Sequence, residues 1–253
     1  MWRRRCFQAL GVLLILSPLG IALLRPPAQA QLRHEEQLAI VIDDLGYDRA
    51  DADALATLPI PLTVAVLPDL AHSSEVAERA WRQGREVLLH LPMEARADTG
   101  RRAGVGLGPG MDDTEVDAVV GAMLETVPHA IGVSNHRGSR ATADRPLMEA
   151  LMTVLGKRGL FLIDSRTTTA TVALVTAQRA GVRVAARNVF LDNIPERRAI
   201  LGQLELAALH ARRSGATIAI GHPHPATIAA LGEGLPRLEA QGVRLVFASD
   251  VVQ

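Results

Sequence analysis

Short apolar runs rich in β-branched residues alternate with helical stretches over most of this chain, and this alternation restricts the fold more than any other feature. The runs have the length and composition of buried strands, and the stretches between them carry Leu, Ala, Val and Met at helical spacing. Strands that are separated by helices usually run parallel in one sheet. We therefore expect an α/β protein with a single, distorted (β/α) barrel of about seven or eight strands. The expected strands are residues 38–42, 62–67, 86–91, 130–133, 160–163, 182–185, 217–220 and 243–247, and the expected helices are residues 73–83, 112–126, 146–157, 171–179, 195–213 and 225–240.

Glycine recurs at the ends of the expected helices, just before the next strand. Because glycine has no Cβ, it readily adopts the left-handed conformation that commonly ends a helix. The recurrence supports a series of βα units. These helix-ending residues are Gly84, Gly159, Gly181, Gly215 and Gly242.

The first 30 residues have the pattern of a secretory signal rather than of the fold. Arginines occupy positions 3–5, an apolar run covers residues 9–24, and Ala28-Gln29-Ala30 supplies the small residues that a signal peptidase reads. We expect residues 1–30 to be a signal peptide and the protein to be exported to the periplasm or cell envelope. An uncleaved N-terminal anchor is the alternative, and it would be the only contact with a membrane.

The remaining sequence is expected to comprise a polar linker, residues 31–37, and one (β/α) barrel domain, residues 38–253. The single cysteine, Cys6, lies in the signal segment, so the exported chain would have no disulfide. Cleavage would also remove four arginines from a sequence with 27 basic and 27 acidic residues, which leaves a mildly acidic protein. No basic stripe with interleaved aromatic residues is present, so no nucleic-acid partner is expected.

Polar residues with catalytic or ligating side chains follow almost every expected strand. Because parallel strands of a barrel end at the same face, these residues are expected to converge on one crevice. Taken singly, each has an ordinary alternative: an aspartate often caps a helix, and a histidine is often a surface or core residue. The segments are Asp43-Asp44, His90 to Glu94, residues 134–140, residues 164–167, Asp192-Asn193 and His222-Pro223-His224.

Two imidazoles and a carboxylate are a ligand set that suits zinc or a similar divalent ion, with positions left for water and substrate. The sequence has no HExxH helix and no GxSxG elbow, so Ser139 and Ser165 are expected to donate hydrogen bonds in loops. The glycine-rich segment 99–110 lacks the context of a phosphate loop and is expected to be a rim loop, with no nucleotide bound. Metal-assisted hydrolysis uses most of the cluster.

The ordered motifs IVIDDLG, GREVLLHLPME, GVSNHRGSR, FLIDSRT, NVFLDN and AIGHPHP resemble the divergent polysaccharide deacetylase family, from Leu38 to the end of the chain. This family is a branch of the polysaccharide deacetylase superfamily, whose members have a (β/α) barrel. The resemblance implies a metal-dependent removal of N-acetyl groups from a polysaccharide or peptidoglycan-like glycan. By position, Asp43 resembles the catalytic base, Asp44 a metal ligand, His90 the first metal histidine and His222 the catalytic acid.

The chain departs from the superfamily pattern at Glu94, which occupies the second histidine position of the HxxxH pair. A third ligand must then come from Glu94 or from His136. We favour His136, because an imidazole preserves a set of two nitrogens and one oxygen. The departure also supports an alternative function, a catalytically silent barrel that binds a glycan or a partner in the envelope.

Further residues of the motifs receive provisional roles. Arg166 or Arg137 is expected to orient Asp43 or hold an oxyanion, with a structural ion pair as the alternative for either. Asp164 is expected to support a ligand histidine or to cap the following helix. His224 is expected at the rim. The residues expected to contact substrate are Asn135, Arg137, Asp192 and Asn193, although a turn before Pro195 also explains the last two.

The signal pattern leads to a first prediction. Protein recovered from an envelope fraction should begin at Gln31, because the residues before it match a signal-peptidase site. N-terminal sequencing checks this. Recovery of the full-length chain from the cytoplasm would contradict it.

Overall fold

The computed structural model describes residues 36–98 and 106–253. The expected signal peptide, nearly all of the linker and residues 99–105 of the glycine-rich segment lie outside these ranges. No helix within them is long and apolar enough to span a membrane.

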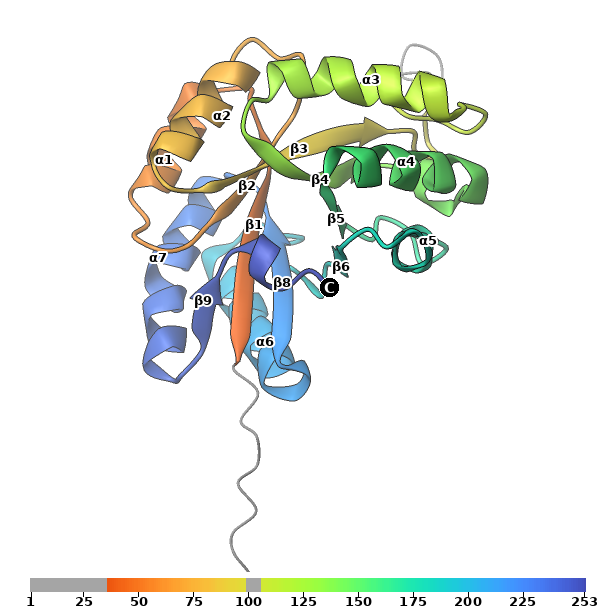
Figure 1. Ribbon diagram of the computed structural model, residues 1–253. Coiled ribbons are helices and arrows are strands. Elements are labelled where there is room, and N and C mark those ends of the chain that lie inside the picture. Colours follow the sequence, from red (N-terminus) through yellow and green to blue (C-terminus); the bar gives the residue numbers. More distant parts are fainter. Residues whose placement is uncertain (1–35, 99–105) are drawn as a thin grey trace, which may run out of the picture. The chain divides into compact units, whose positions relative to one another are not determined.

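One sheet of parallel strands forms the centre of the domain (Figure 1). Its order is β6-β5-β4-β3-β2-β1-β8-β7, and β9 pairs with the first half of β1. This arrangement confirms the expected distorted (β/α) barrel. The strands are β1 (Gln37–Leu45), β2 (Thr63–Val66), β3 (Glu86–Met93), β4 (Ala130–Arg137), β5 (Phe161–Asp164), β6 (Val184–Ala186), β7 (Val189–Phe190), β8 (Ala216–Gly221) and β9 (Arg244–Val246).

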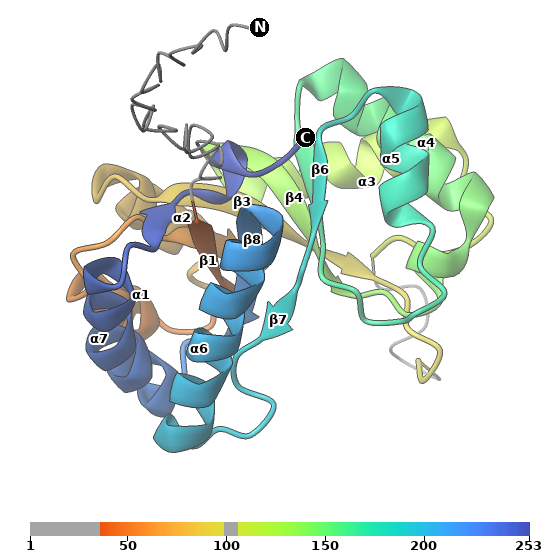
Figure 2. The same cartoon turned by 90° about the horizontal axis from the view of Figure 1, so that it is seen from below.

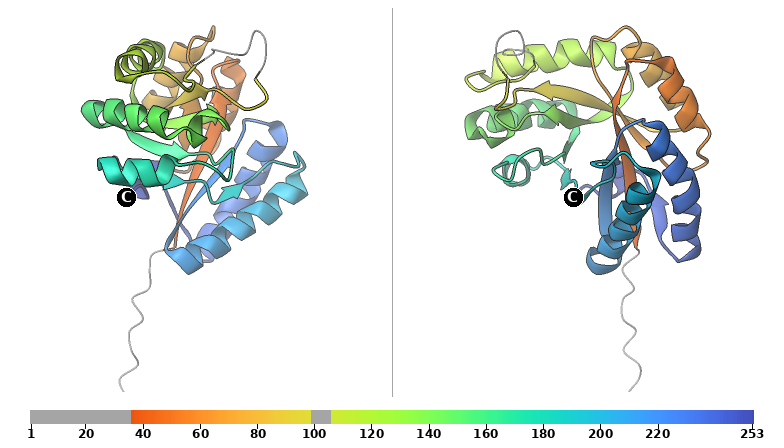
Figure 3. Two further views of the ribbon diagram at one scale, coloured as in Figure 1. Left: turned by 90° about the vertical axis from the view of Figure 1, so that its right-hand side faces the viewer. Right: turned by 180° about the vertical axis from the view of Figure 1, so that it is seen from behind.

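Helices surround the strands on the outside, as the views along and across the sheet show (Figures 2 and 3). All six expected helices form, and the five glycines expected to end helices all have positive φ. Helix α1 was not predicted, because it is short and buries only Ala52 and Leu55. The helices are α1 (Arg49–Ala56), α2 (Ser73–Arg82), α3 (Asp113–Thr126), α4 (Arg145–Arg158), α5 (Ala173–Ala180), α6 (Arg197–Ser214) and α7 (Pro225–Ala240).

The strands are apolar on both faces because each face is buried in a different environment. In β1, Leu38, Ile40 and Ile42 belong to the larger core cluster, which includes the helices. Ala39 and Val41 belong to a second cluster, made mostly of strand residues, that fills the inside of the barrel. Alternate side chains of a strand point to opposite faces, so a strand covered on both faces needs a continuous apolar run.

A single extended segment, residues 184–190, connects the two ends of the sheet. Its first half, β6, pairs with β5, and its second half, β7, pairs with β8. At the change of partner, the Arg187 amide donates to the Asp164 carbonyl at 2.9 Å and the Asn188 amide to the Ile218 carbonyl at 2.9 Å. The sequence predicted one strand here and missed β7, because two residues carry no periodicity.

The inner core contains one close approach that tests the packing. A Cβ added at Gly132 of β4 would lie 2.7 Å from the Phe161 ring, whereas one at Gly202 in α6 would meet nothing within 4 Å. Gly132→Ala should therefore destabilise the protein by about 1–3 kcal/mol. Gly202→Ala should stabilise it by up to about 1 kcal/mol, because alanine is the better helix former. Urea denaturation measures both, and equal effects would contradict this account of the core.

Candidate metal centre and active site

Asp43 and Asp44 both line one cleft at the carboxyl end of the sheet, although adjacent residues of a regular strand face opposite sides. The pairing of β1 with β2 shifts register between Ile42 and Leu45, and Asp44 has a left-handed φ of 62°. A residue other than glycine holds this conformation at a cost of about 1–2 kcal/mol. The irregularity is what brings both carboxylates to the cleft.

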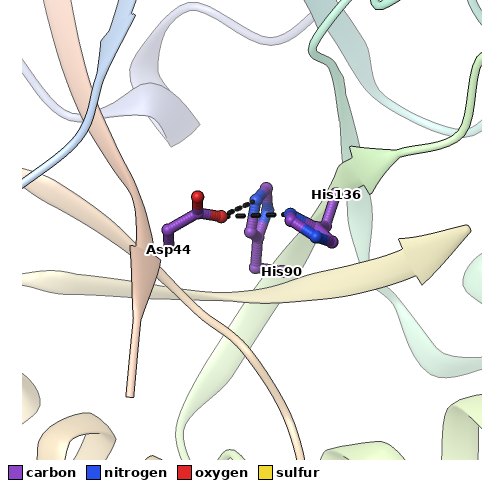
Figure 4. Close-up of side chains that lie close together, drawn as sticks. All are labelled: Asp44, His90 and His136. Atoms are coloured by element: carbon purple, nitrogen blue, oxygen red, sulfur yellow. Dashed lines mark ion pairs between the residues drawn. The ribbon is translucent and has the colours of Figure 1, made fainter. Parts of the chain in front are cut away.

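Asp44, His90 and His136 place three potential ligand atoms together (Figure 4). Asp44 Oδ1 lies 3.1 Å from His90 Nε2 and 3.0 Å from His136 Nδ1. The histidines come from neighbouring strands, β3 and β4, in which His136 pairs with Pro92 and His90 with Ser134. Strand pairing thus brings together residues that are 46 positions apart in the chain.

These three atoms fit a metal ion better than they fit one another. Asp44 Oδ1 is buried and forms no hydrogen bond with any described residue, despite the two nitrogens about 3 Å away. Burial alone raises the pKa of the Asp44 carboxyl, but the imidazoles of His136 and His90 outweigh it and hold that pKa well below its usual range. An ionised oxygen and two nitrogens directed at one point are the donor set of a zinc-type site. That they bind an ion stays a prediction.

Ser134 orients His90 and was not singled out in the sequence. Its hydroxyl lies 2.7 Å from His90 Nδ1, so the other ring nitrogen faces Asp44. A ligand histidine commonly has its second nitrogen held in this way. The signal available in the sequence was spacing, since Ser134 stands two residues before His136 on the same face of β4.

Asp43 is a buried carboxylate with unused hydrogen-bonding capacity. It is 4 % exposed, its Oδ2 lies 3.7 Å from His90 Nε2, and its Oδ1 has no hydrogen-bond partner among the described residues. Burial raises the pKa of Asp43, with the neighbouring His90 opposing it. Neither aspartate caps a helix, because Asp48 caps α1. A carboxylate of this kind is suited to accept a proton.

His222 follows β8 and faces the same cleft, with Nε2 3.7 Å from Asp44 Oδ2. Its Nδ1 lies 3.0 Å from Asp192 Oδ1, and Asp192 Oδ2 accepts hydrogen bonds from the His222 amide at 2.7 Å and from Thr227 at 2.8 Å. Burial lowers the pKa of His222, but Asp192 outweighs it and raises that pKa overall. His222 is therefore held in one orientation and favoured in its protonated form.

The expected substrate contact of Asp192 is corrected by this arrangement. The side chain has no exposed surface, and both oxygens are occupied within the protein. Asp192 positions His222 instead, with Thr227 as a second support that the sequence did not indicate. Asp192 and His222 also lie near His224, and the three offer ligand atoms within 4.8 Å of one another. His224 itself is exposed at the start of α7, at the rim as expected.

Glu94, the alternative third ligand, lies apart from the triad. Its carboxylate forms an ion pair with Arg140, and its carbonyl accepts from the amides of Arg140 and Ala141. Gly108 of the glycine-rich segment packs against it, since a Cβ there would lie 2.6 Å from Glu94 Oε2. Glu94 thus ties loops together, which supports the choice of His136.

Two further residues of the motifs hold loops together. Asn135 lines the cleft but is only 2 % exposed; its Oδ1 accepts from the Ser165 amide at 2.8 Å and its Nδ2 donates to the Arg137 carbonyl at 2.9 Å, so its expected substrate contact stays a prediction. Asp164 touches no histidine and caps no helix. Its oxygens accept from the Arg166 amide at 2.8 Å and from Thr171 at 2.9 Å.

The cleft has a volume of about 440 Å³, and three arginines are among the residues that line it. Arg137 lines it and forms an ion pair with Asp98, the structural alternative considered for that residue. Asn193, expected to contact substrate, also lines the cleft, and so does Arg166, which was expected to orient Asp43 or hold an oxyanion. Arg187 is a third arginine that lines the cleft. It was not predicted from the sequence, because it lies in the segment between β6 and β7, where no strand end was expected.

The sequence matches the family model for divergent polysaccharide deacetylases over residues 40–252, and the chain belongs to this family. Among relatives, the uncharacterised protein YibQ of Escherichia coli (strain K12) is 39 % identical over 216 residues, which are 85 % of this chain and 67 % of YibQ. The family and the fold agree with the resemblance found in the motifs.

Solved structures show the same fold at lower identity. The uncharacterised protein ATU2773 from Agrobacterium tumefaciens C58 has a TM-score of 0.76 and 24 % identity, over 85 % of this chain and 89 % of that one. A CE4 family pseudoenzyme from Bacillus anthracis has a TM-score of 0.57 and 10 % identity, over 87 % and 66 %. A mutant of that pseudoenzyme is described as having restored enzymatic activity.

The triad leads to a prediction about metal content. His136→Ala should lose the bound metal after loading with zinc, because two remaining ligands cannot complete the coordination shell. Glu94→Ala should retain it, because Glu94 pairs with Arg140 rather than with the triad. Elemental analysis of both purified variants decides the matter. Loss of metal only in Glu94→Ala would show that His136 is not the third ligand.

Proposed function

We propose that this protein is an exported, metal-dependent hydrolase that removes N-acetyl groups from an envelope carbohydrate. The observation that carries the proposal is the convergence of Asp44, His90 and His136 beside Asp43, whose Oδ1 has no hydrogen-bond partner among the described residues, with His222 lining the same cleft. Membership of the divergent polysaccharide deacetylase family supports a glycan substrate. The signal pattern of residues 1–30 supports export.

In this proposal, Asp44, His90 and His136 hold a divalent ion, most simply zinc, because two imidazoles and a carboxylate are typical of catalytic zinc sites. When bound, such an ion supplies Lewis acidity, which polarises a carbonyl group and acidifies water. Ser134 maintains the ligand geometry by holding the His90 ring.

Asp43 accepts the proton of the attacking water in this mechanism. Its burial raises its pKa, and its Oδ1 has no hydrogen-bond partner among the described residues. A base works best when its pKa approaches the working pH, and burial moves a carboxyl in that direction.

His222 donates a proton to the departing amine. The Asp192 carboxylate favours the imidazolium form and fixes Nδ1, so that Nε2 is the atom directed toward the cleft. An amine leaves readily only once it is protonated, which makes this second group as necessary as the base.

The alternative is a catalytically silent barrel that binds a glycan or a partner protein. Glu94 in place of the second HxxxH histidine favours it, as does the structural likeness to a CE4 family pseudoenzyme. Acetate release from N-acetylated glycans separates the two functions. Binding of such a glycan without release would favour the silent barrel.

Asp43→Asn and His222→Ala should keep the metal but lose turnover by about a hundred- to ten-thousand-fold. Asn resembles Asp in shape but cannot accept a proton from water, and neither residue belongs to the ligand triad. Acetate release, measured first for the wild-type protein on a panel of N-acetylated glycans, gives the rates, and elemental analysis gives the metal content.

His224→Ala is the matched control for His222→Ala, since His224 is exposed at the rim and lies only two residues away. Its rate should stay close to that of the wild type. A near-normal rate for Asp43→Asn would remove Asp43 from the mechanism.

A further inference from the structure

Arg166 and Arg187 form a part of the cleft, here called the arginine wall, that removal of an acetyl group does not require. Arg166 and Arg187 line the cleft together with Asp44 and His136. Arg187 Nη2 donates to the Arg166 carbonyl at 3.2 Å, so the two residues are in direct contact. Burial lowers the pKa of Arg187 and repulsion from the Arg166 charge lowers it further, with Asp164 and Asp43 opposing without reversing the shift. Two like charges thus lie close together in a partly buried setting, which is unfavourable in the absence of an anion.

No described carboxylate forms an ion pair with either guanidinium group. Asp164 acts on both arginines only at longer range, and its oxygens accept hydrogen bonds from the Arg166 amide and Thr171. Asp98 forms an ion pair with Arg137, the third arginine that lines the cleft. A divalent ion at the triad would be balanced by Asp43 and Asp44. Arg166 and Arg187 thus have no ion-pair partner among the residues that the structure describes, although the charges of Asp164 and Asp43 act on Arg187 from farther away.

Two contacts fix the orientation of the Arg187 guanidinium group in the cleft. Its Nε donates to the Ser165 carbonyl at 2.7 Å, and its guanidinium carbon lies 4.9 Å from the centre of the Phe190 ring. These contacts fix the plane of the group without neutralising it, which reduces the entropy lost on binding. Ser165 is 6 % exposed and lines the same cleft, and its Oγ has no hydrogen-bond partner in the described part of the chain.

Backbone strain is concentrated at this cleft. Five described residues other than glycine have a positive φ, and three of them, Asp44, Arg137 and Arg166, line the cleft at the ends of different strands. Strain of this kind persists where surrounding structure enforces it, and it gathers at functional sites. The triad and both arginines therefore line one cleft.

We propose that the wall formed by Arg166 and Arg187 binds an anionic substituent of the substrate, so that the protein prefers an acidic N-acylated sugar to a neutral one. A guanidinium fork matches the oxygens of a carboxylate or a phosphate. The inference rests on the proposed function for the sugar, whose N-acyl group would lie at the triad. The preference itself is a property of binding and does not depend on turnover.

Isothermal titration calorimetry tests the preference with three probes. N-acetylglucosamine is neutral, N-acetylmuramic acid adds a carboxylate through a lactyl ether, and N-acetylglucosamine 6-phosphate adds a phosphate. The wild-type protein, both zinc-loaded and chelator-treated, should bind at least one acidic probe about tenfold or more tightly than the neutral sugar. The acidic probe that shows the advantage identifies the anion. Raising the salt concentration should reduce the advantage.

Arg166→Gln and Arg187→Gln should each abolish most of this advantage while leaving binding of the neutral sugar nearly unchanged. Arg213→Gln is the matched control: it removes the same charge from the exposed last turn of α6, next to the start of β8 and therefore at the other end of the barrel. Arg166→Gln also guards against misfolding, since no described side-chain hydrogen bond is lost with it.

Two results would overturn the inference. The first is equal affinity of the wild-type protein for neutral and acidic probes. The second is an acidic preference that survives in both arginine variants. If the arginines instead serve Asp43, Arg187→Gln would slow turnover of every substrate and leave the ratio of affinities unchanged. A protein that binds acidic probes preferentially but releases no acetate would contradict the proposed hydrolase and not this inference.

Discussion

The burial of both faces of the sheet is the constraint on which the rest of this structure depends. Helices cover the outside, and the strand side chains of the inner cluster, such as Val41 and Phe161, fill the inside. Polar groups inside either core would lose hydration without compensation. The ionisable side chains Asp44, His90 and His136 therefore meet at the carboxyl ends of the strands, in the last residues of β1, β3 and β4. The site is a consequence of the way the barrel is packed.

Within the site, each reactive group is held by a residue that carries no reactive role. Ser134 holds His90, Asp192 and Thr227 hold His222, and the amide of Asn135 joins the loops after β4 and β5. Such supports explain why polar residues of the motifs outnumber those that can touch a substrate. They also mean that a substitution at a buried support, such as Asp192, changes the chemistry of a group it never replaces.

The contacts of Glu94 explain what this residue does at the position where the superfamily pattern has a histidine. With the ion pair to Arg140 and the close packing of Gly108, this position links the end of β3 to two loops. The imidazole of His136, from the next strand, lies 3.0 Å from Asp44 Oδ1. In the proposed metal site, the third ligand therefore comes from β4 rather than from β3, and Glu94 has a structural role.

From the sequence alone, the strand and helix periodicities determined the βα series and hence the barrel, and the placement of Asp43, Asp44, His90, His136 and His222 after apolar runs determined which residues meet. Tertiary structure decided the rest. Whether Asp192, Asn135 and Asp164 face a ligand or a neighbouring loop depends on side-chain direction and on which backbone groups lack partners, and neither is encoded in local spacing. Arg187 and β7 escaped notice because a segment that changes partners between β5 and β8 has no period of its own.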